Sequence, residues 1–168
     1  MKTPIRENWA QCLHWLAECK PTDAILDPFC GSGTILLEAG MCFTNAPIFQ
    51  EDPWIFDSWN LNWSTAQFKS SSATPRLLAS DRDALSVKKT HQNTRIANIE
   101  VDAVVADIRD LTPEAFDGCP ETGVILCNPP YGMGSGHRTD AVYHWLGETH
   151  RNHFPKWRLY FIATDSRK

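Results

Sequence analysis

The sequence predicts an α/β fold built on a doubly wound, mostly parallel sheet. Short apolar runs of strand length alternate with longer runs of helix length along almost the whole chain. Polar or acidic residues follow several of the strand candidates, at the edge where open α/β sheets bind ligands. With 168 residues, 42% apolar and 21% charged, the chain is expected to form one domain over residues 1–168.

The first elements follow from local patterns. An N-terminal helix segment (1–20) is expected to hold an amphipathic helix from Ile5 to about Glu18, whose apolar residues are Trp9, Cys12, Leu13 and Leu16. AILD (24–27) reads as a short buried strand. TILLEAGMCF (34–43) is apolar enough for a helix packed on a sheet.

Residues 45–75 differ from the alternating pattern around them. They contain Trp54, Trp59 and Trp63 with three prolines, and they end in a Ser/Thr run. The segment is interpreted as an insertion with some helical content. Its aromatic rings fit two roles, anchoring the insertion to the domain or stacking on nucleobases.

Regular alternation resumes after the insertion. RLLASD (76–81) predicts a strand, and Asp83 caps a helix that reaches about Ala97. Three further strands are expected at VDAVVAD (101–107), GVILCN (123–128) and WRLYFIAT (157–164). Repeated β-α-β units predict a parallel sheet with helices on both faces.

Composition excludes several classes of protein. The six cysteines form no CxxC pair and the six histidines are scattered, so neither a disulfide framework nor a metal site is expected. No apolar stretch is long enough to cross a bilayer, and the N-terminus lacks the apolar core of a signal peptide. We therefore expect a cytoplasmic protein without membrane association.

Charge is unevenly distributed along the chain. The net charge is −4, which argues against a general nucleic-acid binder. Up to Gly136 there are 10 Lys/Arg and 17 Asp/Glu residues, whereas from His137 onward there are 6 and 3. This basic end suits a bound nucleic acid, and it equally suits an ordinary solvated helix.

A glycine loop, DPFCGSGT (27–34), joins the first strand to the following helix. Gly31 and Gly33 let the backbone approach a ligand and aim helix N–H groups at it. The spacing is not GxGxxG and no P-loop lysine is present, which disfavours NAD and ATP. A different nucleotide-like ligand is expected.

Two acidic residues end the next two strands. Asp81 is placed to accept hydrogen bonds from both hydroxyls of a ribose, and Asp107 to accept one from the amino group of an adenine. Either carboxylate could instead be a helix cap. Together with the lack of a phosphate clamp, they predict an adenosine cofactor without phosphate, consistent with a sulfonium methyl donor.

The turn CNPPYG (127–132) follows the fourth strand. The Asn128 side-chain oxygen and the Pro129 carbonyl can accept both N–H bonds of a nucleobase amino group and direct its lone pair outward. Pro129 and Pro130 hold these acceptors rigidly, and Tyr131 offers a flat face to an unpaired or flipped base. The alternative is a purely structural role, in which the segment is an Asx-Pro turn that ends a strand.

These motifs resemble a known group. DPFCGSGTILLEAG, SDRD, VVADIRDL and CNPPYG, with PIREN in front, resemble the THUMP-associated RNA guanine-N2 methyltransferases, in particular the bacterial 23S rRNA enzymes. A more distant similarity is to N6-adenine-specific DNA methylases. The resemblance runs from Pro4 to Thr164 and implies a Rossmann-like class I fold with S-adenosyl-L-methionine as cofactor and RNA, foremost rRNA, as partner.

The resemblance also implies roles for individual residues. The cofactor-binding candidates are Asp27, Pro28, Cys30, Gly31, Gly33, Thr34, Asp81, Asp107, Ile108 and Asn128. The candidates that hold the target base are Asn128, Pro129, Pro130 and Tyr131. Pro4, Arg6, Glu7 and Asn8 match a segment that lies near the donor in the family, and the Trp-rich insertion has a counterpart in the rRNA enzymes.

Three hypotheses about function remain open on the sequence. The first is methylation of guanine N2 in structured RNA, and the second is methylation of adenine N6 in DNA or RNA, with tRNA among the possible substrates. Because family members usually carry a THUMP domain and a β-hairpin after the fifth strand, the third is an inactive, truncated fragment or a partner subunit. The target nucleotide and the oligomeric state are left open.

Overall fold

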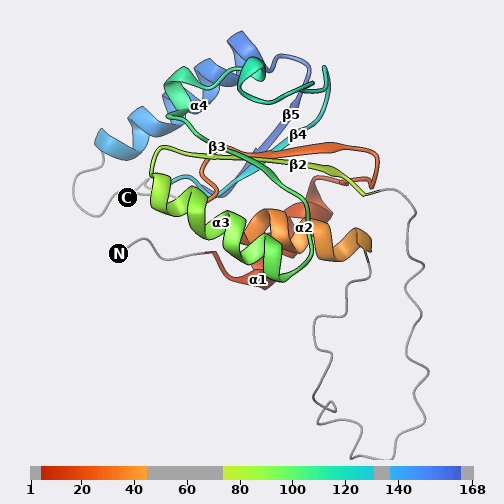
Figure 1. The fold of residues 1–168 in the computed structure, drawn as a ribbon. Coiled ribbons are helices and arrows are strands. Elements are labelled where there is room, and N and C mark those ends of the chain that lie inside the picture. The colour runs from red at the N-terminus through yellow and green to blue at the C-terminus, as the bar shows by residue number, and fades with distance from the viewer. Residues whose placement is uncertain (1–4, 45–73, 131–136, 164–168) are drawn as a thin grey trace, which may run out of the picture.

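A five-stranded parallel sheet forms the centre of the molecule (Figure 1). The computed structural model describes residues 5–44, 74–130 and 137–163, so the predictions for Tyr131 and for most of the Trp-rich insertion lie outside the described residues. The strands are β1 (Ala24–Asp27), β2 (Arg76–Asp81), β3 (Asp102–Val105), β4 (Val124–Cys127) and β5 (Arg158–Phe161). Their order is β3-β2-β1-β4-β5, and all four pairings are parallel.

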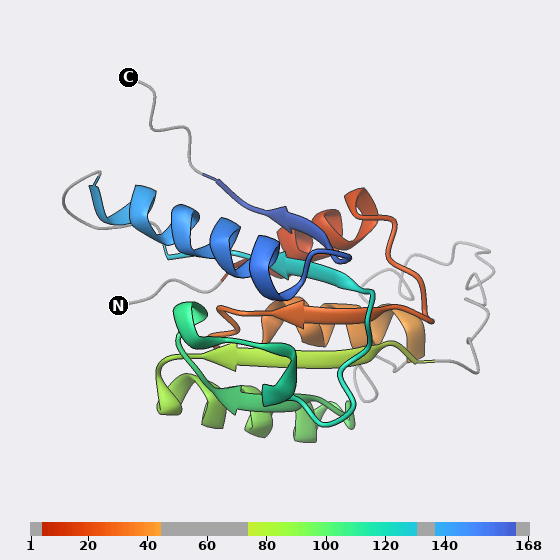
Figure 2. The same ribbon diagram turned by 90° about the horizontal axis from the view of Figure 1, so that it is seen from above.

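The strand order reverses between β1 and β4, which is the switch point of a doubly wound sheet. β1 pairs with β2 on one side and with β4 on the other, so the loops that follow β1 and β4 leave the sheet side by side. Figure 2 shows all five strand arrows running in the same direction, which brings their carboxyl ends to one edge. The fold class predicted from the sequence is confirmed.

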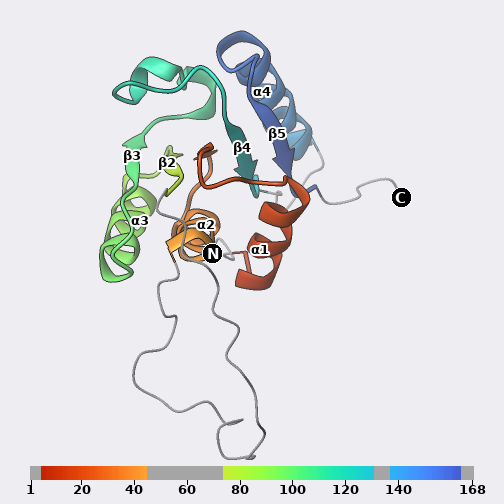
Figure 3. The ribbon, with the colours of Figure 1, turned by 90° about the vertical axis from the view of Figure 1, so that its right-hand side faces the viewer.

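Helices cover both faces of the sheet. They are α1 (Glu7–Leu16), α2 (Thr34–Thr44), α3 (Ala84–Ile96) and α4 (His137–His153), with two short 3-10 turns, η2 (Ile108–Asp110) and η3 (Pro113–Ala115). In Figure 3, α1, α2 and α3 lie on one side of the sheet and α4 on the other. None of the helices within the described ranges has the length and hydropathy needed to cross a membrane.

Alternation along the strands divides the apolar side chains between two cores. Ile25, Leu77 and Leu126 point into the core under α1 and α2. Their neighbours Leu26 and Leu78 point into the opposite core, beneath α4 and the 3-10 turns. Strands buried on both faces are continuous apolar runs, which is why these segments were recognisable in the sequence.

Helix α1 buries a different face from the one predicted. Of the expected apolar residues only Leu13 is buried, whereas Trp9 and Leu16 are 60% and 65% exposed. The buried side instead carries Ala10 and Ala17, both fully inaccessible to solvent. Small side chains allow α1 to approach α2 closely, and polar bonds complete the contact: Gln11 Nε2 donates to Glu38 Oε2 at 2.7 Å, and His14 Nε2 donates to the Ile35 carbonyl at 2.7 Å.

The other predicted bounds agree with the structure to within a few residues. β1 and β2 match residue for residue, and Asp83 caps α3 by accepting a hydrogen bond from Leu85 N at 3.1 Å. β3 ends at Val105 and β5 at Phe161, each earlier than expected. The shorter strands leave Asp107 in a loop rather than in the sheet.

Gly123 and Gly147 differ in the space around them, so replacing each with alanine should change the stability of the protein in opposite directions. A Cβ atom at Gly123 would lie 2.5 Å from the ring of Trp157 and 2.7 Å from the Ala24 carbonyl oxygen, and Trp157 is itself buried against Phe154. A Cβ at Gly147, within α4, would meet only the flexible end of Arg151 at 3.3 Å.

We expect Gly123→Ala to lower the free energy of unfolding by about 2 to 3 kcal/mol through overpacking. Gly147→Ala should raise it by about 0.5 to 1 kcal/mol, because alanine is the better helix former. Urea unfolding followed by circular dichroism measures both changes. A Gly123→Ala protein as stable as the parent would contradict the contact between β4 and Trp157.

Candidate functional site

Four polar side chains lie at the carboxyl edge of the sheet. Asp27, Asp81 and Asn128 end or directly follow β1, β2 and β4, and Asp107 lies two residues beyond β3. Since the strand order is β3-β2-β1-β4, the four positions form a continuous row across the switch point. The fold therefore brings together residues that are up to 101 positions apart in the sequence.

The glycine loop after β1 adopts a conformation that requires glycine. Gly31 has φ +56° and Gly33 has φ +85°, both in the left-handed region. A Cβ at Gly33 would also lie 3.0 Å from Thr90 Cγ2. The loop is tied to the sheet by a hydrogen bond from Cys30 N to the Ser80 carbonyl at 3.0 Å.

Helix α3 braces this loop from the side, which the sequence reasoning missed. The hydroxyl of Thr90, a fully buried residue, lies 3.2 Å from the Gly31 carbonyl oxygen and 3.4 Å from Cys30 Sγ. Asn93 Nδ2 donates to the Ser32 carbonyl at 2.9 Å. A signal was present in the sequence, because Thr90 is a polar residue on the side of α3 that faces the core.

Asp81 connects the glycine loop to the end of β2. Its carboxylate is 3% exposed and accepts hydrogen bonds from Gly31 N at 3.2 Å and Asp83 N at 2.9 Å. The side chain that caps α3 is that of Asp83, so the carboxylate of Asp81 is not the cap of this helix. Its position fits the predicted role at a ribose, although its contacts here are with backbone N–H groups.

The carboxyl of Asp27 is buried beneath the loop. It accepts a hydrogen bond from Phe29 N at 3.0 Å. Burial, with a smaller contribution from the charge of Asp81, raises the pKa of this carboxyl to about 7. Its protonation therefore changes near neutral pH.

Two thiols next to Asp27 are kept protonated. Burial, together with the charge of Asp27, raises the pKa of Cys30 to about 12 and that of Cys127 well above its usual value. A thiol is a poor nucleophile unless it is ionised. Neither cysteine is suited to covalent catalysis.

Within the part of the chain that the structure describes, no group of His, Cys, Asp and Glu could hold a metal ion.

The remaining loop candidates complete the same turn. Pro28 is buried, and Thr34, the first residue of α2, is half-buried with its hydroxyl 3.2 Å from Ser32 Oγ. Of the N-terminal candidates, Asn8 Oδ1 accepts a hydrogen bond from Trp9 N at 3.0 Å, Arg6 precedes α1, and Glu7 begins it. Pro4 lies outside the described residues.

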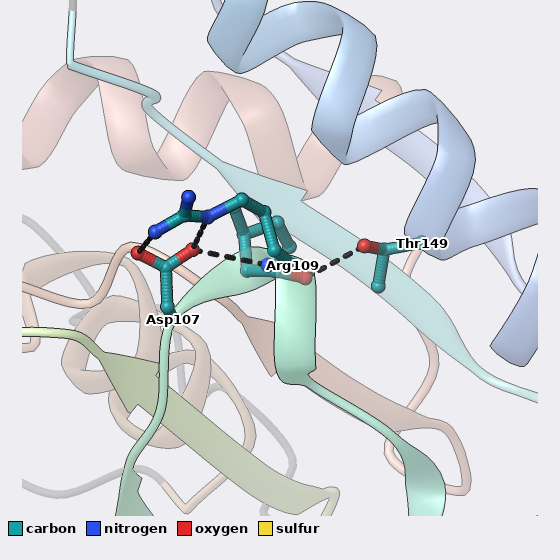
Figure 4. A network of polar contacts seen from close by, with 4 residues as sticks. Asp107, Arg109 and Thr149 are labelled. Atoms are coloured by element: carbon teal, nitrogen blue, oxygen red, sulfur yellow. Dashed lines mark hydrogen bonds and ion pairs between the residues drawn. The ribbon is translucent and has the colours of Figure 1, made fainter.

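Asp107 caps the turn η2 and is held by Arg109 (Figure 4). Arg109 Nε and Nη2 donate to the two carboxylate oxygens at 2.9 and 3.0 Å. These hydrogen bonds lower the pKa of the Asp107 carboxyl. The cap and the ion pair leave Asp107 ionised at the edge of the sheet, beside the buried side chain of Ile108.

Asn128 follows β4 with its amide half-buried. The Oδ1 atom is buried and has no hydrogen-bond partner within the described ranges. A buried oxygen without a partner costs roughly 1 to 3 kcal/mol, which is unusual in native proteins and calls for an explanation. Next to it, Pro129 is buried and Pro130 is exposed.

The edge thus offers three kinds of group. The glycine loop can present its backbone to a ligand, the carboxylates can accept hydrogen bonds from hydroxyl or amino groups, and the Asn128 oxygen is an acceptor without a partner among the described residues. Such a set can bind a nucleoside-like ligand and, beside it, an amino group.

Comparison with known proteins agrees with this arrangement. The model of the family described as "RMKL-like, methyltransferase domain" matches residues 1–168. The ribosomal RNA large subunit methyltransferase K/L of two Aliivibrio fischeri strains is 35% identical over 148 residues, which are 78% of this chain and 20% of the relative. The chain therefore spans about a fifth of the length of these relatives.

Solved structures share the fold. The methyltransferase SMU.472, in complex with SAH, superposes with a TM-score of 0.74 at 25% identity over 96% of this chain and 45% of that one. A predicted N6-adenine-specific DNA methylase from Listeria monocytogenes gives a TM-score of 0.77 at 23% identity, over 99% and 46% of the two chains.

The raised pKa of Asp27 predicts a pH dependence of stability. A carboxyl in the unfolded chain titrates near 3.9, so between about pH 4 and pH 7 the folded state holds a proton that the unfolded state has lost. The contribution of Asp27 to the free energy of unfolding therefore falls as pH rises through this window and is constant above it. The slope is at most about 1.4 kcal/mol per pH unit.

Urea unfolding of the parent and of Asp27→Asn at pH 5, 6, 7 and 8 measures this contribution as the difference between the two proteins. Asparagine keeps an oxygen that can accept from Phe29 N, so it is a conservative replacement. We expect the variant to gain stability relative to the parent from pH 5 to pH 7. If the difference in free energy of unfolding between the two proteins does not change with pH, the raised pKa of Asp27 is contradicted.

Proposed function

Because this chain belongs to the RMKL-like methyltransferase domain family, we propose that it transfers a methyl group from S-adenosyl-L-methionine to an exocyclic amino group of a nucleobase. The observation that carries this proposal is the buried, unpartnered oxygen of Asn128 at the switch point of the sheet. An amino group that donates to this oxygen would satisfy it.

The residues at the carboxyl edge fit this cofactor. S-Adenosylmethionine supplies, when bound, an electrophilic methyl group on a sulfonium centre. The loop of Asp27, Pro28, Cys30, Gly31, Gly33 and Thr34 forms the cradle for its amino-acid part and ribose, since the left-handed glycines keep the backbone free of side chains. Asp81 accepts the ribose hydroxyls, while Asp107 and Ile108 hold the adenine. The complex of SMU.472 with SAH, at 25% identity, supports the choice of cofactor.

Asn128 and Pro129 prepare the target nitrogen. The lone pair of an exocyclic amino nitrogen is delocalised into the base and is a poor nucleophile. Asn128 Oδ1 would accept a hydrogen bond from one N–H of the amino group, and the Pro129 carbonyl would accept one from the other. This favours a tetrahedral nitrogen whose lone pair points toward the methyl donor. Pro129 and Pro130 limit the freedom of these acceptors. Tyr131 stacks on the base, and Asn128 also borders the cofactor.

In-line displacement needs orientation more than a strong base. This agrees with the site, in which the nearby thiols are protonated and the carboxylates are engaged in hydrogen bonds. Deprotonation of the methylated nitrogen can follow the transfer.

Guanine N2 of structured RNA, with 23S rRNA as the foremost candidate, is the substrate we infer. The name of the 35%-identical relative, a ribosomal RNA large subunit methyltransferase, supports it, as does the basic balance of the chain from His137 onward. Adenine N6 in RNA or DNA is the second candidate, since it also presents two N–H bonds and Asn128 would accept either.

Cofactor binding is expected to depend on Asp81. Titration calorimetry of S-adenosylmethionine into the purified chain should give micromolar affinity, and Asp81→Ala should weaken it at least tenfold, about 1.4 kcal/mol. Asp83→Ala is the matched control, because it removes a carboxylate two residues away that caps α3. This control should lose about 1 kcal/mol of stability while its affinity changes less than threefold. Equal weakening by both substitutions would contradict a ribose contact.

Methyl transfer is expected to depend on Asn128. The chain, supplied with labelled cofactor, is incubated with rRNA, tRNA and duplex DNA, and the products are digested to nucleosides. We expect label in N2-methylguanosine from rRNA, and a loss of about 10²-fold in rate for Asn128→Ala, as when one stabilising contact in an active site is removed. The cofactor affinity of the variant should fall much less than its rate.

Other outcomes of this assay discriminate between the hypotheses. Label found only in methyladenine would contradict the guanine proposal and favour the second candidate. Cofactor binding without transfer to any substrate would favour a fragment or partner subunit that binds cofactor without performing the reaction. Equal rates for the parent and Asn128→Ala would contradict the role of the unpartnered oxygen.

A further inference from the structure

The ion pair between Arg109 and Asp107 leaves the carboxylate with a defined hydrogen-bonding capacity. Oδ1 accepts from Arg109 Nε at 2.9 Å and from the backbone N of Arg109 at 3.1 Å. Oδ2 accepts from Nη2 at 3.0 Å. A carboxylate offers about four acceptor positions, two on each oxygen. Among the residues that the structure describes, Oδ1 therefore has both positions filled and Oδ2 keeps one free position.

Helix α4 holds Arg109 and the adjacent backbone in place. The guanidinium carbon lies 4.9 Å from the centre of the Trp145 ring, a cation–π contact. One turn further along α4, the buried Thr149 hydroxyl donates to the Ile108 carbonyl at 2.6 Å (Figure 4). The direction of the Asp107 carboxylate is thus fixed by contacts that do not involve a ligand.

We propose that Arg109 is a positioning residue that sets the base specificity of the cofactor site. It holds Asp107 as an acceptor-only group, whose one free position on Oδ2 recognises the 6-amino group of a purine cofactor. This inference rests on the proposed function, in which Asp107 faces the adenine. It adds a residue to which neither the sequence motifs nor the proposed mechanism assigns a role.

The chemistry distinguishes adenine from its 6-oxo counterpart. A 6-amino group donates to Oδ2, whereas the 6-oxo group of hypoxanthine would place an acceptor against an acceptor. A protonated carboxyl could donate to a 6-oxo group, but the hydrogen bonds from Arg109 favour the ionised form of Asp107. Without Arg109, the carboxylate stays ionised near neutral pH but is free to rotate, so Oδ2 loses its fixed direction and the discrimination weakens.

The test compares two cofactor products that differ only in this group, S-adenosyl-L-homocysteine and S-inosyl-L-homocysteine. Titration calorimetry gives the ratio of their dissociation constants for the parent, Arg109→Gln and Arg109→Lys. Arg109 has a side chain 53% exposed, so neither substitution opens a cavity in the core. Arg151→Gln, which removes an exposed arginine in the last turn of α4, is the matched control.

We expect the parent and the control to prefer the adenosyl compound by at least about tenfold, because one mismatched hydrogen-bonding pair typically costs a factor of this order or more. Arg109→Gln should reduce this ratio at least threefold. Arg109→Lys should lie between them, since lysine keeps the charge but lacks the planar fork. A purely structural role would weaken both ligands equally and leave the ratio unchanged.

A second substitution tests the acceptor directly. Asp107→Asn can present an amide N–H to a 6-oxo group, so it should lower the ratio further than Arg109→Gln does. Either an unchanged ratio in Arg109→Gln or a parent that binds both compounds equally would overturn the role of Arg109 while leaving the proposed function intact. A folded parent that binds neither compound would overturn the cofactor assignment, and with it this inference.

Discussion

The buried carboxylate of Asp81 is the interaction on which the organisation of the site depends. It accepts N–H groups from the loop after β1 and from the turn that starts α3, and so joins two loops that are 50 residues apart in the sequence. Both loops leave the carboxyl edge of neighbouring parallel strands, which is the geometry that makes one carboxylate able to reach both. Through Gly31 N, this contact holds the loop that contains the left-handed Gly31 and Gly33.

Two helices on opposite faces of the sheet support the two halves of this edge. Thr90 and Asn93 of α3 bind carbonyl groups of the glycine loop, while Trp145 and Thr149 of α4 contact the turn that carries Asp107. Helix α4, which supports Asp107, is also the next helix along the chain after the turn that is proposed to hold the target base.

Much of the fold was predictable because its strands are buried on both faces. Continuous apolar runs marked β1, β2 and β4 with little ambiguity, and the alternation with helices predicted the parallel sheet. The family resemblance read from the loop and turn motifs is confirmed by the family match over the whole chain. The prediction for α1 was wrong in its buried face, because periodicity favoured the large apolar residues Trp9 and Leu16 over the alanines that contact α2.

The sequence by itself determined the element order, the edge of the sheet where the candidate site lies, and the identity of its glycines, carboxylates and turn. These features can be read locally, because a buried strand appears as a short apolar run and a left-handed turn as a glycine. Only the tertiary structure decided how the polar groups are paired. It showed that Asp81 binds the glycine loop, that Arg109 forms hydrogen bonds with Asp107, and that the buried Asn128 oxygen has no hydrogen-bond partner among the residues that the structure describes. The contact between Asp81 and the glycine loop depends on the packing of segments 50 residues apart, which no local pattern records, whereas Asp107 and Arg109 are only two residues apart and their pairing follows from the local turn.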